Sequence, residues 1–192
     1  MIEYIAGRVA ELTPALAVVE TRGGVGYGLN ISIATYEALS GKQECRLLVH
    51  EVVRDDAWIL YGFATARERE LFRSLIGVSG VGAATAVIML SALPGDELAA
   101  VIAAGDVKRL KSIKGIGAKT AERIIVDLRD KLKTDATAIP ATAHTESYDE
   151  ALGALSMLGF DRKQSEKVLT KLFSATPTLR VEDAIKQALS LL

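Results

Sequence analysis

The stretch that decides the fold is residues 110–124, Leu-Lys-Ser-Ile-Lys-Gly-Ile-Gly-Ala-Lys-Thr-Ala-Glu-Arg-Ile. It predicts a helix, a tight turn at Gly115 and Gly117, and a second helix. Glycine permits a positive φ in such a turn and lets another backbone approach closely. The first N–H groups of the second helix lack intrahelical partners, so with the helix dipole they form a site for an anion such as phosphate. Lys114, Lys119 and Arg123 add positive charge around it.

A second copy of this pattern lies 35 residues upstream, in residues 75–89. One glycine turn is equally well explained by an ordinary helix cap, but two copies with matching apolar flanks indicate a repeat. The pattern resembles the helix-hairpin-helix motif, which holds the DNA backbone without reading bases. The candidate backbone-binding residues are Gly80, Val81, Gly82, Lys114, Gly115, Ile116, Gly117, Lys119, Thr120 and Arg123.

The distribution of charge favours a nucleic-acid partner, although the net charge of the chain is only −1. Residues 1–64 carry a net −3, residues 65–133 a net +4 and residues 134–192 a net −2. The positive segment holds both glycine turns, and a local basic patch is what phosphate binding requires.

Composition bounds the class of protein. The 192 residues are enough for one large domain or two to three small ones. Cys45 is the single cysteine, which excludes a disulfide framework and suits a reducing cytoplasm. We expect no signal peptide and no membrane span, because no apolar run approaches the roughly 18 residues that a span needs.

The fold class that the sequence predicts is multidomain α+β. Residues 1–64 contain short segments rich in β-branched and aromatic residues, separated by turn signals, which predict a small OB-like barrel. The expected strands are residues 2–12, 15–21, 25–33, 44–53 and 58–63, with a short helix at residues 34–39.

Asp55 and Asp56 lie at the predicted tip of the last hairpin of this barrel. They are open to three interpretations: an ordinary polar turn, the start of a metal site, or a pair of carboxylates that repel DNA phosphates.

Residues 65–133 predict an all-α domain that carries both hairpins, with helices near residues 66–75, 83–93, 97–104, 107–113 and 118–132. We expect Glu68, Arg69 and Glu70 on a polar face of the first helix, and Asp96 as a helix cap. Residues 134–147 have almost no large apolar side chains and predict a flexible linker.

Residues 148–192 predict a three-helix bundle, with helices near residues 148–157, 162–172 and 181–191 and caps at Asp161 and Thr178. The turn at residues 158–160 resembles that of ubiquitin-associated-like domains. Leu155, Leu158 and Phe160 either fill the core or form an exposed patch for a partner.

The sequence contains no recognisable motif for nucleotide hydrolysis, metal binding or nucleophilic catalysis. Residues 115–120 do not fit a P-loop, because Ala118 separates Gly117 from Lys119. His50 and His144 have neither metal-ligand spacing nor an obvious nucleophile to activate. We therefore expect no metal, no cofactor and no catalytic residues: a binding protein rather than an enzyme.

The order of barrel, tandem hairpins, linker and bundle closely resembles the RuvA family, the Holliday-junction-binding subunits of bacterial branch-migration complexes. The resemblance covers the full chain. It implies a homotetramer, alone or doubled to an octamer on DNA, that binds four-way junction DNA. It makes Asp55 and Asp56 an acidic pin at the crossover, and it assigns Leu155, Leu158 and Phe160 to a RuvB-like ATPase motor in recombination and repair. A junction resolvase is a further partner that the resemblance leaves open.

The sequence also departs from the family pattern. Ala83-Ala84 stands where Pro-Lys is frequent, and Ala118-Lys119 where a Lys pair is frequent. We therefore expect the second hairpin to supply most of the electrostatic attraction. Two alternatives stay open: a DNA-processing nuclease that uses the hairpins to hold substrate, and a protein-interaction adaptor in which the hairpins only pack.

Overall fold

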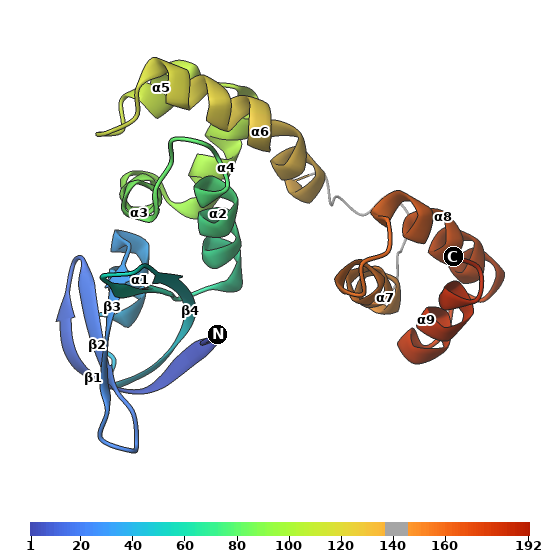
Figure 1. Ribbon diagram of the computed structural model, residues 1–192, viewed down its shortest axis with the longest axis horizontal. Coiled ribbons are helices and arrows are strands. Elements are labelled where there is room, and N and C mark those ends of the chain that lie inside the picture. Colours follow the sequence, from blue (N-terminus) through green and yellow to red (C-terminus); the bar gives the residue numbers. More distant parts are fainter. Residues whose placement is uncertain (137–145) are drawn as a thin grey trace. The chain divides into compact units, whose positions relative to one another are not determined.

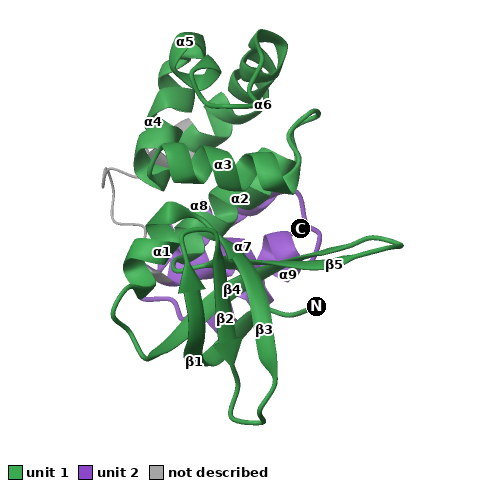
Figure 2. Ribbon diagram, turned by 90° about the vertical axis from the view of Figure 1, so that its left-hand side faces the viewer, with its two compact units in different colours: residues 1–138 green, residues 139–192 purple. Residues whose placement is uncertain are grey.

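The computed structural model describes residues 1–136 and 146–192 (Figure 1). The chain divides into two compact units, residues 1–138 and 139–192 (Figure 2). The predicted linker, residues 134–147, falls mostly outside the described residues. Its first and last residues belong to helices, because α6 continues to Ala136 and α7 begins at Glu146.

The first unit begins with a closed barrel of strands in the order β1-β2-β3-β5-β4. The β3–β5 pair is parallel and the other pairs are antiparallel. Glycine is required at Gly7, where β1 lies against the end of β2, since a Cβ there would lie 2.1 Å from the carbonyl oxygen of Glu20. The elements are β1 (Tyr4–Thr13), β2 (Leu16–Glu20), β3 (Gly26–Ile31), α1 (Ile33–Leu39), β4 (Glu44–Val53) and β5 (Trp58–Phe63).

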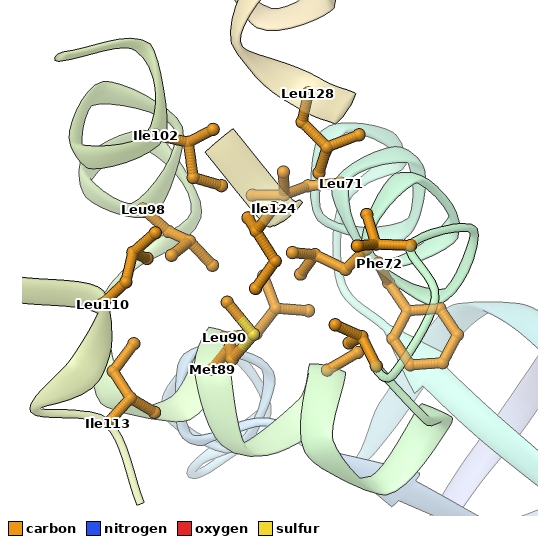
Figure 3. Packing of buried hydrophobic residues seen from close by; sticks show 14 of the residues in the cluster. Leu71, Phe72, Met89, Leu90, Leu98, Ile102, Leu110, Ile113, Ile124 and Leu128 are labelled. Atoms are coloured by element: carbon orange, nitrogen blue, oxygen red, sulfur yellow. The ribbon is translucent and has the colours of Figure 1, made fainter. Parts of the chain in front are cut away.

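The five helices that follow the barrel in the first unit pack around an apolar core (Figure 3). They are α2 (Ala66–Ile76), α3 (Ala83–Ala92), α4 (Gly95–Ala104), α5 (Val107–Lys111) and α6 (Ala118–Ala136). Tyr61 and Phe63 of the barrel belong to the same core, and the rings of Phe63 and Phe72 lie 4.8 Å apart. The barrel and the helices are therefore joined by continuous apolar packing.

The second unit consists of α7 (Glu146–Met157), α8 (Arg162–Ala175) and α9 (Val181–Leu189). Its core includes Leu152, Leu155, Leu169 and the ring pair Tyr148–Phe173, whose centroids are 5.5 Å apart. This core is small, as expected for a bundle of this length.

The structure confirms the predicted fold class and corrects several local predictions. Asp96 does not cap α4: the N-cap is Pro94, and the Asp96 carboxylate instead pairs with Arg67 at 2.8 Å. Thr178 caps no helix, because Arg180 is the N-cap of α9. Asp161 caps α8 as predicted, by accepting a hydrogen bond from the N–H of Gln164.

Within the described residues, no single helix has both the length and the apolar character to cross a membrane. The pair α3 and α4 meets that criterion only in combination, across a bend of 98°.

Candidate nucleic-acid interface

The first hairpin turn joins α2 to α3 through a short set of backbone hydrogen bonds. The N–H of Val78 donates to the carbonyl of Leu75 at 3.0 Å, and the N–H of Val81 donates to Val78 at 3.0 Å. Gly80 has a φ of 93°, which an L side chain rarely adopts. Gly82 is the N-cap of α3, and no side chain caps this end. The N–H groups at the start of α3 are therefore left for an external acceptor.

The second hairpin turn repeats this geometry. The N–H of Ile113 donates to Leu110 and that of Ile116 donates to Ile113, both at 3.1 Å. Gly115 has a φ of 91°, close to that of Gly80. The N–H of Ala121 donates to the carbonyl of Gly117 at 2.9 Å, and in the first hairpin the N–H of Ala86 donates to the carbonyl of Gly82 at the same distance. The repeat in the sequence is thus a repeat in backbone conformation.

The apolar residues of the turns fix the direction in which the backbone faces. Val78, Val81, Ile113 and Ile116 are all buried, with at most 6% of each exposed. The glycines between them are exposed, and a Cβ at Gly82, Gly115 or Gly117 would meet no other atom of the chain within 4 Å. Buried side chains therefore hold the turns in the core while the glycine backbone faces outward, where a phosphate can approach closely.

The two hairpins lie next to each other. Nη1 of Arg123, on α6 after the second turn, donates to Oγ of Ser79 in the first turn at 3.2 Å. A Cβ added to Gly80 would lie 3.8 Å from Oγ1 of Thr120. The two turns, and the helix N-termini that follow them, therefore lie close together on the surface.

Positive charge is concentrated on the second hairpin. Lys114 and Lys119 are exposed, and neither has an ion-pair partner among the described residues. At the positions that match Lys119 and Arg123, the first hairpin has Ala84 and Ile88, which are also exposed. The first hairpin thus offers mainly backbone N–H groups, whereas the second adds cations.

The acidic pair closes the β4–β5 hairpin. The N–H of Arg54 donates to the carbonyl of Ala57 at 2.8 Å and the reverse bond is 3.4 Å, which leaves Asp55 and Asp56 as the two-residue tip. Both are exposed, and no ion pair involving either is found within residues 1–136 and 146–192. Figure 2 shows the end of this hairpin reaching out beyond the other strands. The described residues contain no group of three or more His, Cys, Asp or Glu placed to hold a metal ion.

A buried polar contact between barrel and helices was missed by the sequence reasoning. Glu68, Arg69 and Glu70 were expected on a polar face of α2. Glu68 and Arg69 are each only 8% exposed, and of the three only Glu70 is exposed to solvent. The Glu68 carboxylate accepts hydrogen bonds from the hydroxyls of Ser32 and Thr35. The signal was present in the spacing, because Glu68 lies one helical turn before the buried Leu71 and Phe72.

Arg69 joins the same two regions. Its Nη1 donates to the carbonyl of Glu3 at 3.1 Å and contacts the Glu3 carboxylate at 2.5 Å.

Burial and the nearby Arg73 lower the pKa of His50, whose ring packs edge-on to Phe72. Burial raises the pKa of the Cys45 thiol, which favours its neutral, unreactive form. Cys45 also packs against the apolar core of the barrel.

The three apolar residues assigned to the motor do not share one environment. Leu155 is fully buried in the core of the second unit, so of the two alternatives it fills the core. Leu158 is 62% exposed, Phe160 is 37% exposed and Met157, which was not predicted, is 91% exposed. The turn is a Schellman motif: Gly159 has a φ of 92°, and the N–H of Phe160 donates to the carbonyl of Leu155. The exposed apolar set is therefore Met157, Leu158 and Phe160.

Comparison with known proteins matches each part of the chain to a family model. Residues 1–62 match the RuvA N-terminal domain, residues 72–130 a SAM-like helix-hairpin-helix tandem, and residues 146–192 the RuvA C-terminal domain. A protein of Bacteroides fragilis is 48% identical over 98% of both chains. Proteins of Porphyromonas gingivalis and Flavobacterium psychrophilum are 44% identical over 100% and 42% identical over 98% of both chains. Each is described as Holliday junction branch migration complex subunit RuvA. This chain belongs to the RuvA family.

Proposed function

We propose that the chain binds four-way (Holliday) DNA junctions through their backbone and holds them open for a branch-migration motor. The observation that carries this proposal is the pair of adjacent hairpin turns with matching hydrogen bonds. Two neighbouring sites of outward-facing N–H groups suit two phosphates of one DNA arm. Main-chain donors carry no base information, so binding depends on the shape of the DNA rather than its sequence.

The acidic tip supplies the preference for a junction. Asp55 and Asp56 repel phosphates, so a hairpin that carries them is a poor contact for a continuous duplex. At a crossover, the same repulsion keeps the strands apart and favours their exchange. We propose that a homotetramer, singly or as an octamer of two tetramers, places these tips at the centre and the basic hairpins along the arms.

The chain acts as the non-catalytic subunit in this proposal. The exposed set Met157, Leu158 and Phe160 of the second unit binds a RuvB-like ATPase motor, which supplies the energy from ATP. The relatives are described as subunits of a Holliday junction branch migration complex, which supports a division of labour between subunits. We propose that the protein works in the cytoplasm, in recombination and DNA repair.

A gel-shift experiment tests the proposal. The full chain is titrated against a four-way junction and against a linear duplex of equal length, with and without Mg²⁺. We expect a preference for the junction, no cleavage of either DNA, and weaker binding of both by the Lys119→Ala, Arg123→Ala double variant.

The other outcomes identify the alternatives. Cleavage that requires Mg²⁺ would indicate a nuclease that uses the hairpins to hold its substrate. Absence of DNA binding, with no effect of the double variant, would indicate a protein-interaction adaptor. Equal binding to junction and duplex would contradict junction recognition but leave backbone binding intact.

A further inference from the structure

Trp58, the only tryptophan of the chain, is exposed beside the acidic tip. It begins β5 and pairs across the hairpin with Val53, the last residue of β4. The exposed fractions are 63% for Trp58 and 72% for Val53. A large aromatic side chain normally contributes through burial, so this placement adds little to the fold.

The indole ring is held in place although it is exposed. Its Nε1 donates to Oε2 of Glu51 at 3.3 Å. The other carboxylate oxygen of Glu51 accepts from the N–H of Ile2 at 3.2 Å, so Glu51 is itself tied to the start of the chain. The polar edge of the ring is therefore satisfied within the protein, while its apolar surface faces solvent. An oriented aromatic surface loses little conformational entropy when a flat partner stacks on it.

The surroundings of Trp58 select the kind of partner. Asp55 and Asp56 lie within three residues of it on the same hairpin, and their charge repels the phosphate backbone. A nucleobase is uncharged and has a π-face, so it can approach where a phosphate cannot. A second protein copy fits less well, because a stable interface buries about 800 Å² per partner and this ribbon offers little more than two apolar side chains.

We propose that Trp58 is a stacking site for an unpaired nucleobase at the junction crossover. This inference rests on the proposed function, in which the acidic tip lies where the strands exchange. Strand exchange breaks base pairs there and exposes base faces. Stacking on Trp58 stabilises the open crossover, while the carboxylates keep the phosphates away.

The single tryptophan makes the proposal directly measurable. The full chain is titrated with a four-way junction that carries unpaired thymines at the crossover, with a fully paired linear duplex as reference, while tryptophan emission is recorded. We expect emission to be quenched by the junction and not by the duplex. Trp58→Ala should weaken binding of this junction about tenfold, with Trp58→Phe retaining most of the affinity. Val53→Ala is the matched control, with a change below about twofold.

The outcomes separate this inference from the function on which it rests. Normal junction binding without quenching, and with Trp58→Ala as tight as the unchanged chain, would overturn the stacking site alone. Failure of the unchanged chain to bind the junction would overturn both. A second copy as the occupant would show as an emission shift with protein concentration in the absence of DNA, together with a change in sedimentation on Trp58→Ala, and would also overturn the stacking site.

Discussion

Oγ1 of Thr35, in the short helix of the barrel, donates a hydrogen bond of 2.7 Å to Oε2 of Glu68, on the first helix of the hairpin region. The same hydroxyl accepts the N–H of Ala64, the residue that leads from the barrel into that helix. Ser32 donates to the other carboxylate oxygen of Glu68. The barrel, which carries the acidic tip, is thus fixed to the helices that carry the hairpin turns.

Removal of the Glu68 carboxylate should destabilise the first unit. Glu68→Ala leaves the buried hydroxyls of Ser32 and Thr35 without their acceptor, which we expect to lower the free energy of unfolding by about 2 kcal/mol. Urea denaturation followed by circular dichroism measures the change. Glu70→Ala, on the exposed side of the same helix, should change stability by less than about 0.5 kcal/mol. An equal effect of the two substitutions would contradict the buried contact.

The two glycines of the second turn should have different roles, Gly115 in folding stability and Gly117 in DNA binding. Gly115→Ala forces a side chain into a φ of 91° and should cost about 1–2 kcal/mol of stability. Gly117→Ala meets no neighbouring atom and should cost less, but its methyl group stands in the path of a phosphate. We expect Gly117→Ala to weaken DNA binding while its melting temperature stays closer to that of the unchanged chain. If the variant bound DNA as tightly, the phosphate would not contact this turn.

Lys119 should contribute one phosphate contact. Lys119→Ala should reduce the slope of log affinity against log salt concentration by about 0.9 and weaken junction and duplex binding alike. Fluorescence anisotropy at several salt concentrations gives the slope. Lys163→Ala, an exposed lysine of the second unit, serves as the control and should leave the slope unchanged. If Lys119→Ala weakened binding of the junction but not of the duplex, Lys119 would not contact the duplex arms of the junction.

The first hairpin should gain affinity from an added cation. Ala84 is exposed and matches Lys119 in the repeat, so Ala84→Lys places a positive charge beside the N–H groups of α3. We expect tighter junction binding and a salt slope steeper by about 0.9. An unchanged slope would show that this hairpin does not touch phosphate.

The acidic tip, Asp55 and Asp56, should increase the preference of the protein for a junction over a linear duplex. The double variant Asp55→Asn, Asp56→Asn removes the repulsion of phosphates but keeps the size of the side chains. We expect its affinity for linear duplex to rise and the ratio of junction to duplex affinity to fall. Competition between the two DNAs for the same protein measures that ratio. A ratio that stayed constant would show that the tip does not face DNA.

Local patterns in the sequence were sufficient to predict the parts that carry the DNA-binding proposal. The positive φ of Gly80 and Gly115 follows from a turn that only glycine tolerates, and the repeat fixed their equivalence. The barrel was predictable because segments rich in β-branched and aromatic residues alternate along residues 1–64 with turn signals. The end of α6 was not predictable from apolar periodicity, since the helix continues to Ala136 after that pattern stops.

The remaining features depend on tertiary contacts. Glu68 and Arg69 are charged residues whose burial is tolerated only because hydroxyl and carbonyl partners come from the distant barrel. Leu155 and Leu158 are both leucines near one turn, and only the packing of α8 and α9 decides that the first is buried and the second exposed. The contact between Arg123 and Ser79 also joins residues that are remote in sequence, so composition alone did not indicate it.

The central claim is that this chain recognises the four-way geometry of DNA. The most direct measurement is the dissociation constant for a four-way junction and for a linear duplex with the same number of base pairs, by fluorescence anisotropy in one buffer of physiological salt. The account predicts that the junction binds at least about tenfold more tightly, a difference of about 1.4 kcal/mol. Equal dissociation constants for the two DNAs would contradict it.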